Sequence, residues 1–244
     1  MTAEDVRTKL KSLASPVAAK LAARFFKTGP GQYGEGDTFI GINVPTLRTV
    51  SREFRALPLD DIQSLLNSPI HEERHVALLI LVLQVTKCDE IHRKRGFDLY
   101  LSSTQFINNW DLVDCSAPQV VGGHLMSRSR EPLFVLAKSK SLWERRIAIV
   151  STQHFIRHGE FGETLTISRM LLGDKEDLIH KATGWMLREV GKKDQAVLEG
   201  FLNRHAASMP RTMLRYAIER FPPDQRRVYL RGKNSSTGGT TDGV

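Results

Sequence analysis

The chain has 244 residues and carries 35 Lys and Arg against 27 Asp and Glu, a formal net charge of +8. This length fits one or two domains with a sizeable core, and 25% charged with 41% apolar residues excludes a mostly disordered or fibrous chain. The longest apolar run, residues 76–83, is far shorter than the roughly 20 residues of a membrane-spanning helix. The basic excess indicates a polyanionic partner without identifying it.

The two cysteines, Cys88 and Cys115, give neither a disulfide framework nor a Cys-x-x-Cys metal motif. The first residues lack the charged-then-apolar pattern of an export signal. We therefore expect a reduced, cytoplasmic setting and no membrane partner.

Helical periodicity dominates the chain, and no segment has the alternation of a strand. Residues 29–41 contain five glycines and one proline and are expected to form a loop, after which Asn43 is the expected N-cap of a helix that starts near Pro45. Residues 231–244 are rich in Gly, Ser and Thr, and we expect a disordered tail there. The expected helices are residues 6–27 (broken near Ser15), 45–55, 60–66, 71–85, 93–102, 105–121, 131–137, 142–157, 161–172, 178–192, 195–205, 210–220 and 223–230.

Small or apolar residues recur in similar helical segments at intervals of 36, 35, 34 and 35 residues. A period near 35 with two helices per unit is typical of a helical solenoid, in which each unit buries its apolar stripe against its neighbours. The alternative is a helical domain whose helix lengths are even by coincidence. The recurring residues are Ala77, Val113, Ala148, Ala182 and Ala217.

The row of residues two positions before these is mostly basic, so we expect it to lie on a surface, the concave face of the solenoid. It consists of His75, Asp111, Arg146, His180 and Arg215.

The segment 109–114, Asn-Trp-Asp-Leu-Val-Asp, is the most unusual in the chain. Trp110 and Asp114 are four residues apart, so a helix places them on one face. From spacing alone, a core tryptophan with two solvated aspartates is the plainer interpretation. However, three adjacent repeats supply four residues that could act together: Trp110, Asp114, Arg146 and Trp185. If the helices that carry them are parallel neighbours, these residues would border one cleft.

The histidines show no metal-binding pattern. His71 and His75 have helical spacing, but the sequence places no third ligand near them, and we expect no metal site. Cys115 directly follows Asp114 without a matched histidine base, so we expect it to pack in the interior.

Five segments together resemble the AlkD family, bacterial DNA glycosylases built of HEAT-like helical repeats that excise alkylated purines. The resemblance covers roughly residues 10–230 and implies an all-α, right-handed solenoid of about six HEAT-like helix pairs, forming one domain over residues 1–230. The segments are Phe39-x-Gly41-Ile42-x-x-Pro45-x-x-Arg48, His71-Glu72-x-Arg74, Trp110-Asp111-x-x-Asp114, Trp143-x-x-Arg146-x-Ala148-Ile149 and Lys181-Ala182-x-Gly184-Trp185-x-Leu187-Arg188-Glu189.

The resemblance implies that Asp114 is the catalytic carboxylate, that Trp110 and Trp185 contact the damaged nucleotide, and that Arg146 supports the site and the DNA backbone. It also implies that the duplex is gripped from outside, without a base-flipping pocket. The family often has a tyrosine where this chain has Phe25 and Phe26, and the segment 29–37 is longer than expected. The candidates for backbone contact are Arg146, Arg188, Lys192, Lys193, Arg211 and Arg215.

One well-placed carboxylate suits a purine alkylated at N3 or N7, because such a base is already cationic and leaves without a general acid. The expected function is therefore hydrolysis of the N-glycosidic bond of cationic alkylated purines in double-stranded DNA, namely 3-methyladenine, 7-methylguanine or bulkier N3 or N7 adducts, leaving an abasic site. We expect a bacterial, nucleoid-associated monomer that uses no cofactor. Two alternatives stay open: a catalytically inactive family member that binds nucleic acid, and a HEAT-repeat scaffold for proteins.

Overall fold

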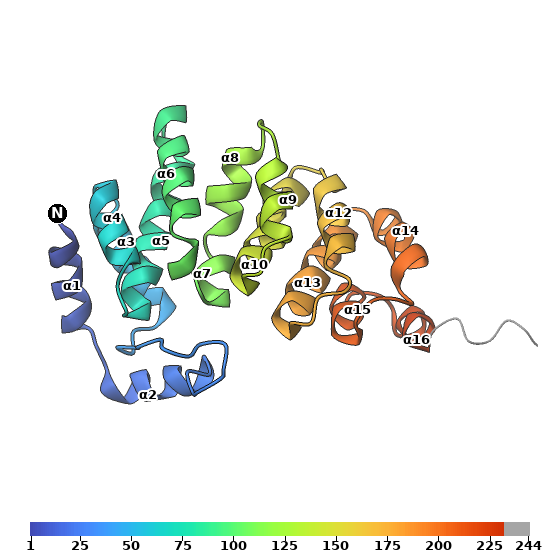
Figure 1. Cartoon of the computed structure of the whole chain (residues 1–244), viewed down its shortest axis with the longest axis horizontal. Coiled ribbons are helices and arrows are strands. Elements are labelled where there is room, and N and C mark those ends of the chain that lie inside the picture. Colours follow the sequence, from blue (N-terminus) through green and yellow to red (C-terminus); the bar gives the residue numbers. More distant parts are fainter. Residues whose placement is uncertain (232–244) are drawn as a thin grey trace, which may run out of the picture. The chain divides into compact units, whose positions relative to one another are not determined.

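A computed structural model describes residues 1–231, and the regular elements in that range are helices (Figure 1). The described residues contain no strand, and their one isolated β-bridge joins Thr38 to Ile70. The expected all-α fold class is thus confirmed. Within the same range, no helix combines the length and the apolar character needed to cross a bilayer. Arg231 closes the last helix, whereas the rest of the expected tail, residues 232–244, lies outside the described residues.

The chain divides into two compact units, an N-terminal unit of residues 1–154 and a C-terminal unit that begins at Phe155. The organisation of residues 1–230 as one continuous domain stays a prediction. The N-terminal unit contains, in chain order, α1 (Ala3–Ser12), α2 (Pro16–Phe25), α3 (Val44–Glu53), α4 (Leu59–Leu66), α5 (His71–Thr86), α6 (Glu90–Ser102), the short turn η1 (Thr104–Phe106), α7 (Trp110–Asp114), the π-helical turn η2 (Pro118–Gly122), α8 (Gly123–Leu125), α9 (Glu131–Ala137) and α10 (Leu142–Ser151).

The C-terminal unit is built around α13, which packs against α12, α14 and α15. Its core is formed by residues such as Leu187, Phe201 and Met213, all at most 2% exposed. The boundary between the units falls within α11 (Gln153–Arg157), and the remaining helices are α12 (Gly162–Met170), α13 (Asp177–Lys193), α14 (Gln195–His205), α15 (Arg211–Ala217) and α16 (Pro223–Arg231).

The five recurring residues from Ala77 to Ala217 are all buried, at no more than 1% exposure. Their burial is what the repeat interpretation requires. The row two positions earlier does not behave as expected in the N-terminal unit. His75 and Arg146 are buried there, because α5 and α10 are each covered by several neighbouring helices. In the C-terminal unit, His180 is half-buried and Arg215 is exposed.

Residues 105–121 do not form the single helix expected from periodicity. Asn109 has an extended backbone (φ −148°, ψ 154°), and its side chain accepts a hydrogen bond from the backbone N–H of Trp110. It therefore caps a new helix, α7, which begins at Trp110. Pro118 lacks a backbone N–H, and the regular helix ends before it. The result is a short helix whose first and last residues are Trp110 and Asp114.

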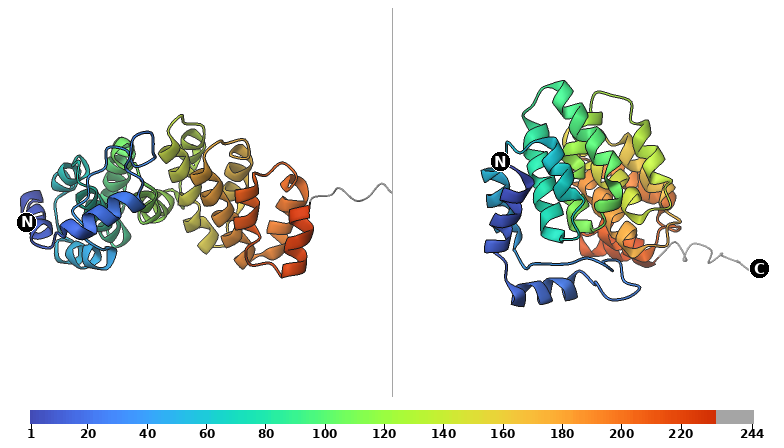
Figure 2. Two further views of the ribbon diagram at one scale, coloured as in Figure 1. Left: turned by 90° about the horizontal axis from the view of Figure 1, so that it is seen from below. Right: turned by 60° about the vertical axis from the view of Figure 1, so that its left-hand side comes forward.

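The glycine-rich loop after α2 is held tightly against that helix (Figure 2). The loop doubles back along α2, and the N–H of Ser15 donates to the carbonyl of Ile40 at 2.9 Å. Gly41 has φ +82°, and a Cβ there would lie 2.2 Å from the Ser15 carbonyl oxygen. Only glycine meets both demands, which explains its place in the sequence motif.

Gly184 should be equally intolerant of a side chain. A Cβ at this position of α13 would lie 2.4 Å from the Met213 carbonyl oxygen and 2.6 Å from Tyr216 Cβ. We expect Gly184→Ala to lower the free energy of unfolding by about 1–3 kcal/mol, because α15 would have to move. Gly200→Ala in α14 is the matched control: its Cβ meets nothing within 4 Å, and it should stabilise by up to about 1 kcal/mol. Urea denaturation of both variants measures the difference, and equal stabilities would contradict the close packing of α13 on α15.

Candidate active site

Asp114, at the end of α7, is held by a two-point ion pair. Arg146 of α10 donates from Nε to Asp114 Oδ1 at 2.9 Å and from its terminal nitrogen to Oδ2 at 2.8 Å. The Arg146 side chain is 6% exposed, whereas that of Asp114 is 19% exposed. The planar guanidinium thus fixes the carboxylate from the protein side and leaves part of it open to solvent.

The electrostatic setting of Asp114 differs from that of an ordinary surface aspartate. Burial raises the pKa of Asp114, and the opposing pull of Arg146 cancels this only in part. The nearby charge of Asp111 adds to the rise. A carboxylate with a raised pKa is a better proton acceptor than an exposed one, which suits it to a role as a base.

Asp111, three residues earlier, faces α5 instead. Its Oδ2 lies 2.8 Å from His71 Nε2 and 3.4 Å from His75 Nδ1. Burial alone would raise its pKa, but the two histidines hold the pKa of Asp111 far below the usual range. The expectation that His71 and His75 have no third potential ligand nearby is therefore wrong, because α7 begins beside α5 and brings Asp111 to them.

Both histidines are buried at 2% exposure, and the Asp111 carboxylate acts to raise the pKa of each. Burial lowers the pKa of His71, but hydrogen bonds to Asp111 and Asp37 outweigh it and raise the pKa to about 8. Burial likewise lowers the pKa of His75, and the neighbouring Cys115 and Asp111 raise it to about 9.

Asp37, at the end of the glycine-rich insert, is a residue that sequence reasoning missed. Its Oδ2 lies 3.0 Å from His71 Nδ1 and accepts from Asn109 Nδ2 at 3.2 Å, and its Oδ1 pairs with Arg74. Burial acts to raise the pKa of Asp37, but His71 and Arg74 lower it below its usual value. A loop without periodicity carries no sequence signal for such a contact.

The ring of Trp110 lies in an aromatic cluster. Phe26 stacks on it at a centroid distance of 5.4 Å, and the exposed Phe25 meets it edge-on at 6.1 Å. The indole Nε1 donates to the hydroxyl of Tyr33 at 3.3 Å. A tyrosine hydroxyl is thus present beside Trp110 although positions 25 and 26 are phenylalanines, since the insert supplies it.

Glu72 anchors the start of the site. This buried carboxylate, in the first turn of α5, accepts the backbone N–H groups of Ile40 (3.0 Å), Gly41 (2.7 Å) and Ile42 (3.3 Å). It therefore fixes the return of the insert to the N-terminus of α5.

The other predicted site residues lie in the C-terminal unit. Trp185 of α13 is half-buried, and its indole donates to Glu189 at 3.2 Å. Lys192 pairs with Glu189 at 2.7 Å, and Arg188 pairs with Glu219 and Glu189. Lys193 and Arg215 are exposed. Their meeting with Asp114 in one cleft stays a prediction.

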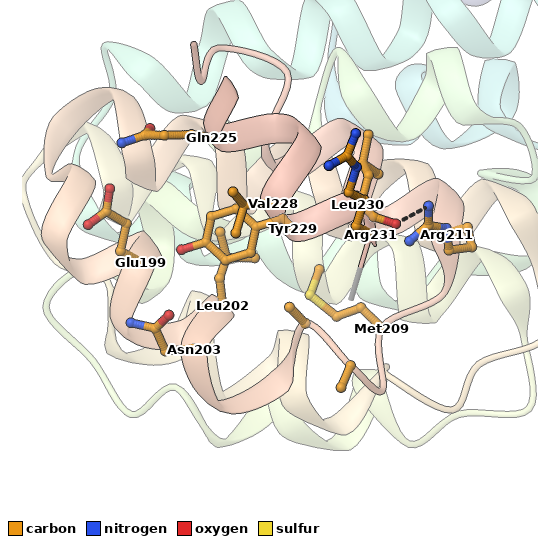
Figure 3. A pocket seen from close by; sticks show the side chains of 12 residues that line it. Glu199, Leu202, Asn203, Met209, Arg211, Gln225, Val228, Tyr229, Leu230 and Arg231 are labelled. Carbon is orange, nitrogen blue, oxygen red and sulfur yellow. Dashed lines mark hydrogen bonds between the residues drawn. The ribbon is translucent and has the colours of Figure 1, made fainter. Parts of the chain in front are cut away.

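The C-terminal unit also contains a hollow of about 520 Å³ between α14 and α16 (Figure 3). Leu202, Met209 and Tyr229 line it, and Arg211 donates across its edge to the carbonyl of Leu230 at 2.8 Å. Of the predicted site residues, only Arg211 borders this hollow, and its guanidinium bonds to the backbone of α16 there.

Comparisons with known proteins place this geometry in context. The model of a family described as DNA alkylation repair enzyme matches residues 6–221. A solved structure described as a predicted DNA alkylation repair enzyme from Enterococcus faecalis is similar with a TM-score of 0.67 and 16% identity. The alignment covers 86% of this chain and 97% of that one, and at this identity it shows the fold alone. No curated protein matches the chain.

The anchoring role of Glu72 is testable by hydrogen exchange. In Glu72→Gln, an amide NH₂ replaces one oxygen that faces three backbone N–H groups, so the amides of residues 40–42 should exchange faster. We expect a local loss of about 1–3 kcal/mol in protection. Glu53→Gln is the control, because Glu53 is exposed and pairs with Lys9 alone. Unchanged exchange at residues 40–42 in Glu72→Gln would contradict the anchor.

Proposed function

Because the chain belongs to the family of DNA alkylation repair enzymes, we propose that it is a monofunctional DNA N-glycosylase that releases cationic alkylated purines from duplex DNA. Family membership supports a role in DNA repair with DNA as partner. The observation that carries the finer proposal is the carboxylate of Asp114, fixed by Arg146 and still partly open to solvent.

The chemistry needs few groups. The N9–C1′ bond of a purine alkylated at N3 or N7 breaks with its electron pair going to the base, which leaves neutral. Positive charge develops on the sugar, and a water oxygen forms the new bond to C1′. Asp114 stabilises the positive charge and accepts the proton that water gives up.

Asp111 is unsuited to help as a general acid, and this supports the choice of substrate. Its pKa lies far below the usual range, so it holds no proton at neutral pH, and both imidazoles face it. A neutral base such as uracil would need a donor for its leaving group. A cationic methylpurine, such as 3-methyladenine or 7-methylguanine, does not.

Aromatic and basic side chains support the binding of such a lesion. Trp110 and Trp185 would attract a cationic base by roughly 0.5–2 kcal/mol each when desolvated. Surface ion pairs such as Lys192 with Glu189 contribute little to stability. A lysine or arginine in such a pair can therefore leave its carboxylate and bind a DNA phosphate at a small cost in free energy. The segment 109–115 contains no lysine to form a Schiff base with the sugar, so we expect no lyase activity.

The direct test is release of methylpurine from methylated duplex DNA. We expect Asp114→Asn to keep the fold and duplex binding but to lose base release by about 100-fold or more, because the amide neither stabilises the cation nor accepts a proton. Asp98→Asn, which removes an exposed carboxylate paired with Lys94, is the matched control and should release base at the wild-type rate.

Three outcomes would overturn parts of this proposal. Wild-type release by Asp114→Asn would remove Asp114 from catalysis. No release by the wild-type chain, with duplex binding that weakens steeply as salt rises, would instead indicate a DNA-binding protein without activity. Absence of salt-dependent duplex binding would favour a scaffold for proteins.

The raised pKa of Asp114 also predicts the acid limb of activity. Asp114 must be ionised to act, so the single-turnover rate should fall as pH decreases through its pKa, above the ordinary value of 3.8. The groups that interact with it electrostatically are Arg146 from α10, Asp111 from α7 and the buried Tyr100 from α6. Rates are measured against spontaneous release from the same duplex. An inflection at or below pH 3.8 would contradict the raised pKa.

A further inference from the structure

Three potential ligand atoms converge in the interior of the N-terminal unit. His71 Nε2 and His75 Nδ1 come from adjacent turns of α5, and Asp111 Oδ2 comes from the first turn of α7. All three atoms lie within 4.8 Å of one another. The two histidines are 2% exposed, and the Asp111 side chain is 11% exposed, so the cluster is buried but reachable beside the carboxylate.

Asp37 fixes the orientation of the His71 ring. Its Oδ2 lies 3.0 Å from His71 Nδ1, so Nε2 is the ring nitrogen that faces Asp111. His71 Nε2 lies 2.8 Å from Asp111 Oδ2, and two atoms this close need either a proton or a metal ion between them.

The two aspartates of the cluster have different partners. Asp37 pairs with Arg74. The partners of Asp111 in the cluster are its two histidines, whose rings can carry either protons or a metal ion toward it. His75 Nε2 has no hydrogen-bond partner among the described residues, and its Nδ1 lies 3.4 Å from Asp111 Oδ2, with the Cys115 thiol as a further neighbour of the ring.

We propose that His71, His75 and Asp111 bind a divalent transition-metal ion, with Zn²⁺ as the best match. Two imidazole nitrogens and one carboxylate oxygen are a donor set that zinc prefers, and three protein ligands leave one position for water. Ligand atoms around a tetrahedral zinc lie roughly 3.3 Å apart; the His75–Asp111 separation of 3.4 Å matches this, and the His71–Asp111 hydrogen-bond distance of 2.8 Å would widen when a metal ion replaces the proton. Asp37 on the far nitrogen of His71 is the outer-sphere carboxylate that orients many zinc-binding histidines.

Bound metal would tie α7 to α5. The ion would hold the first turn of the helix that carries Trp110 and Asp114, and its charge would replace the histidine protons that otherwise face Asp111. This inference does not depend on the proposed glycosylase activity, because metal uptake is measured without DNA.

The test uses the full, tag-free chain, stripped with a chelator and compared before and after addition of Zn²⁺. At neutral and at mildly alkaline pH, calorimetry should show one Zn²⁺ per chain. Thermal unfolding should shift up by about 5–10 °C at a hundredfold excess of free Zn²⁺ over the Kd. Co²⁺ in its place should give the visible absorption of a tetrahedral site.

Variants separate this site from adventitious binding. His75→Gln should weaken Zn²⁺ binding by more than about 100-fold, and Asp37→Asn by about 10–100-fold. His124→Gln is the matched control, since His124 is a buried histidine of the same unit that stacks on Phe97, and it should bind like the wild type. If His75→Gln does not fold, calorimetry of the stripped wild-type chain still shows whether Zn²⁺ binds.

The proposal is wrong if the stripped wild-type chain binds no Zn²⁺ at either pH, or if His75→Gln and His124→Gln bind it equally. In the first case protonated histidines supply the charge that faces Asp111. Base release by a chain that binds no metal would leave the proposed function intact, and metal uptake by a chain without base release would leave the metal site intact.

Discussion

The buried ionic contacts of Asp37 and Asp111 with His71 hold the N-terminal unit in one arrangement. They join three segments that are distant in sequence: the glycine-rich insert, α5 and α7. Removing charged groups from water costs several kcal/mol each unless they are paired, so these segments have few other ways to pack. Glu72 adds to this constraint from the next residue of α5, where it binds the backbone of residues 40–42.

The same contacts give two carboxylates only three residues apart different partners and opposite pKa shifts. Asp111 is turned toward two imidazoles and its pKa falls, whereas Asp114 is buried against one guanidinium and its pKa rises. The short helix α7 makes this division possible, because its first turn faces α5 and its end faces α10. One carboxylate is thus occupied by two histidines, and the other pairs with Arg146 and stays partly open to solvent.

The two proposals draw on this division in different ways. The glycosylase proposal uses Asp114, its partner Arg146 and the aromatic cluster around Trp110, with further contacts from the C-terminal unit. The metal proposal uses Asp111 and the histidines behind it. They share α7, so a metal ion that steadies the first turn would also steady the position of Asp114, but each is tested by its own measurement.

The sequence by itself determined most of the helices, the Asn43 cap and the recurrence of the buried residues from Ala77 to Ala217, because periodicity and capping are local properties of the chain. The resemblance also pointed to Asp114 and Arg146, and the structure pairs them. Only tertiary packing decided that His75 and Arg146 are buried. It also brought Tyr33 to Trp110 and Asp37 to His71. Finally, it placed the Asp111 carboxylate beside two histidines. Those contacts depend on how a glycine-rich loop folds back and where α7 starts against α5. Neither the fold of this loop nor the starting point of α7 produces a periodic pattern in the sequence.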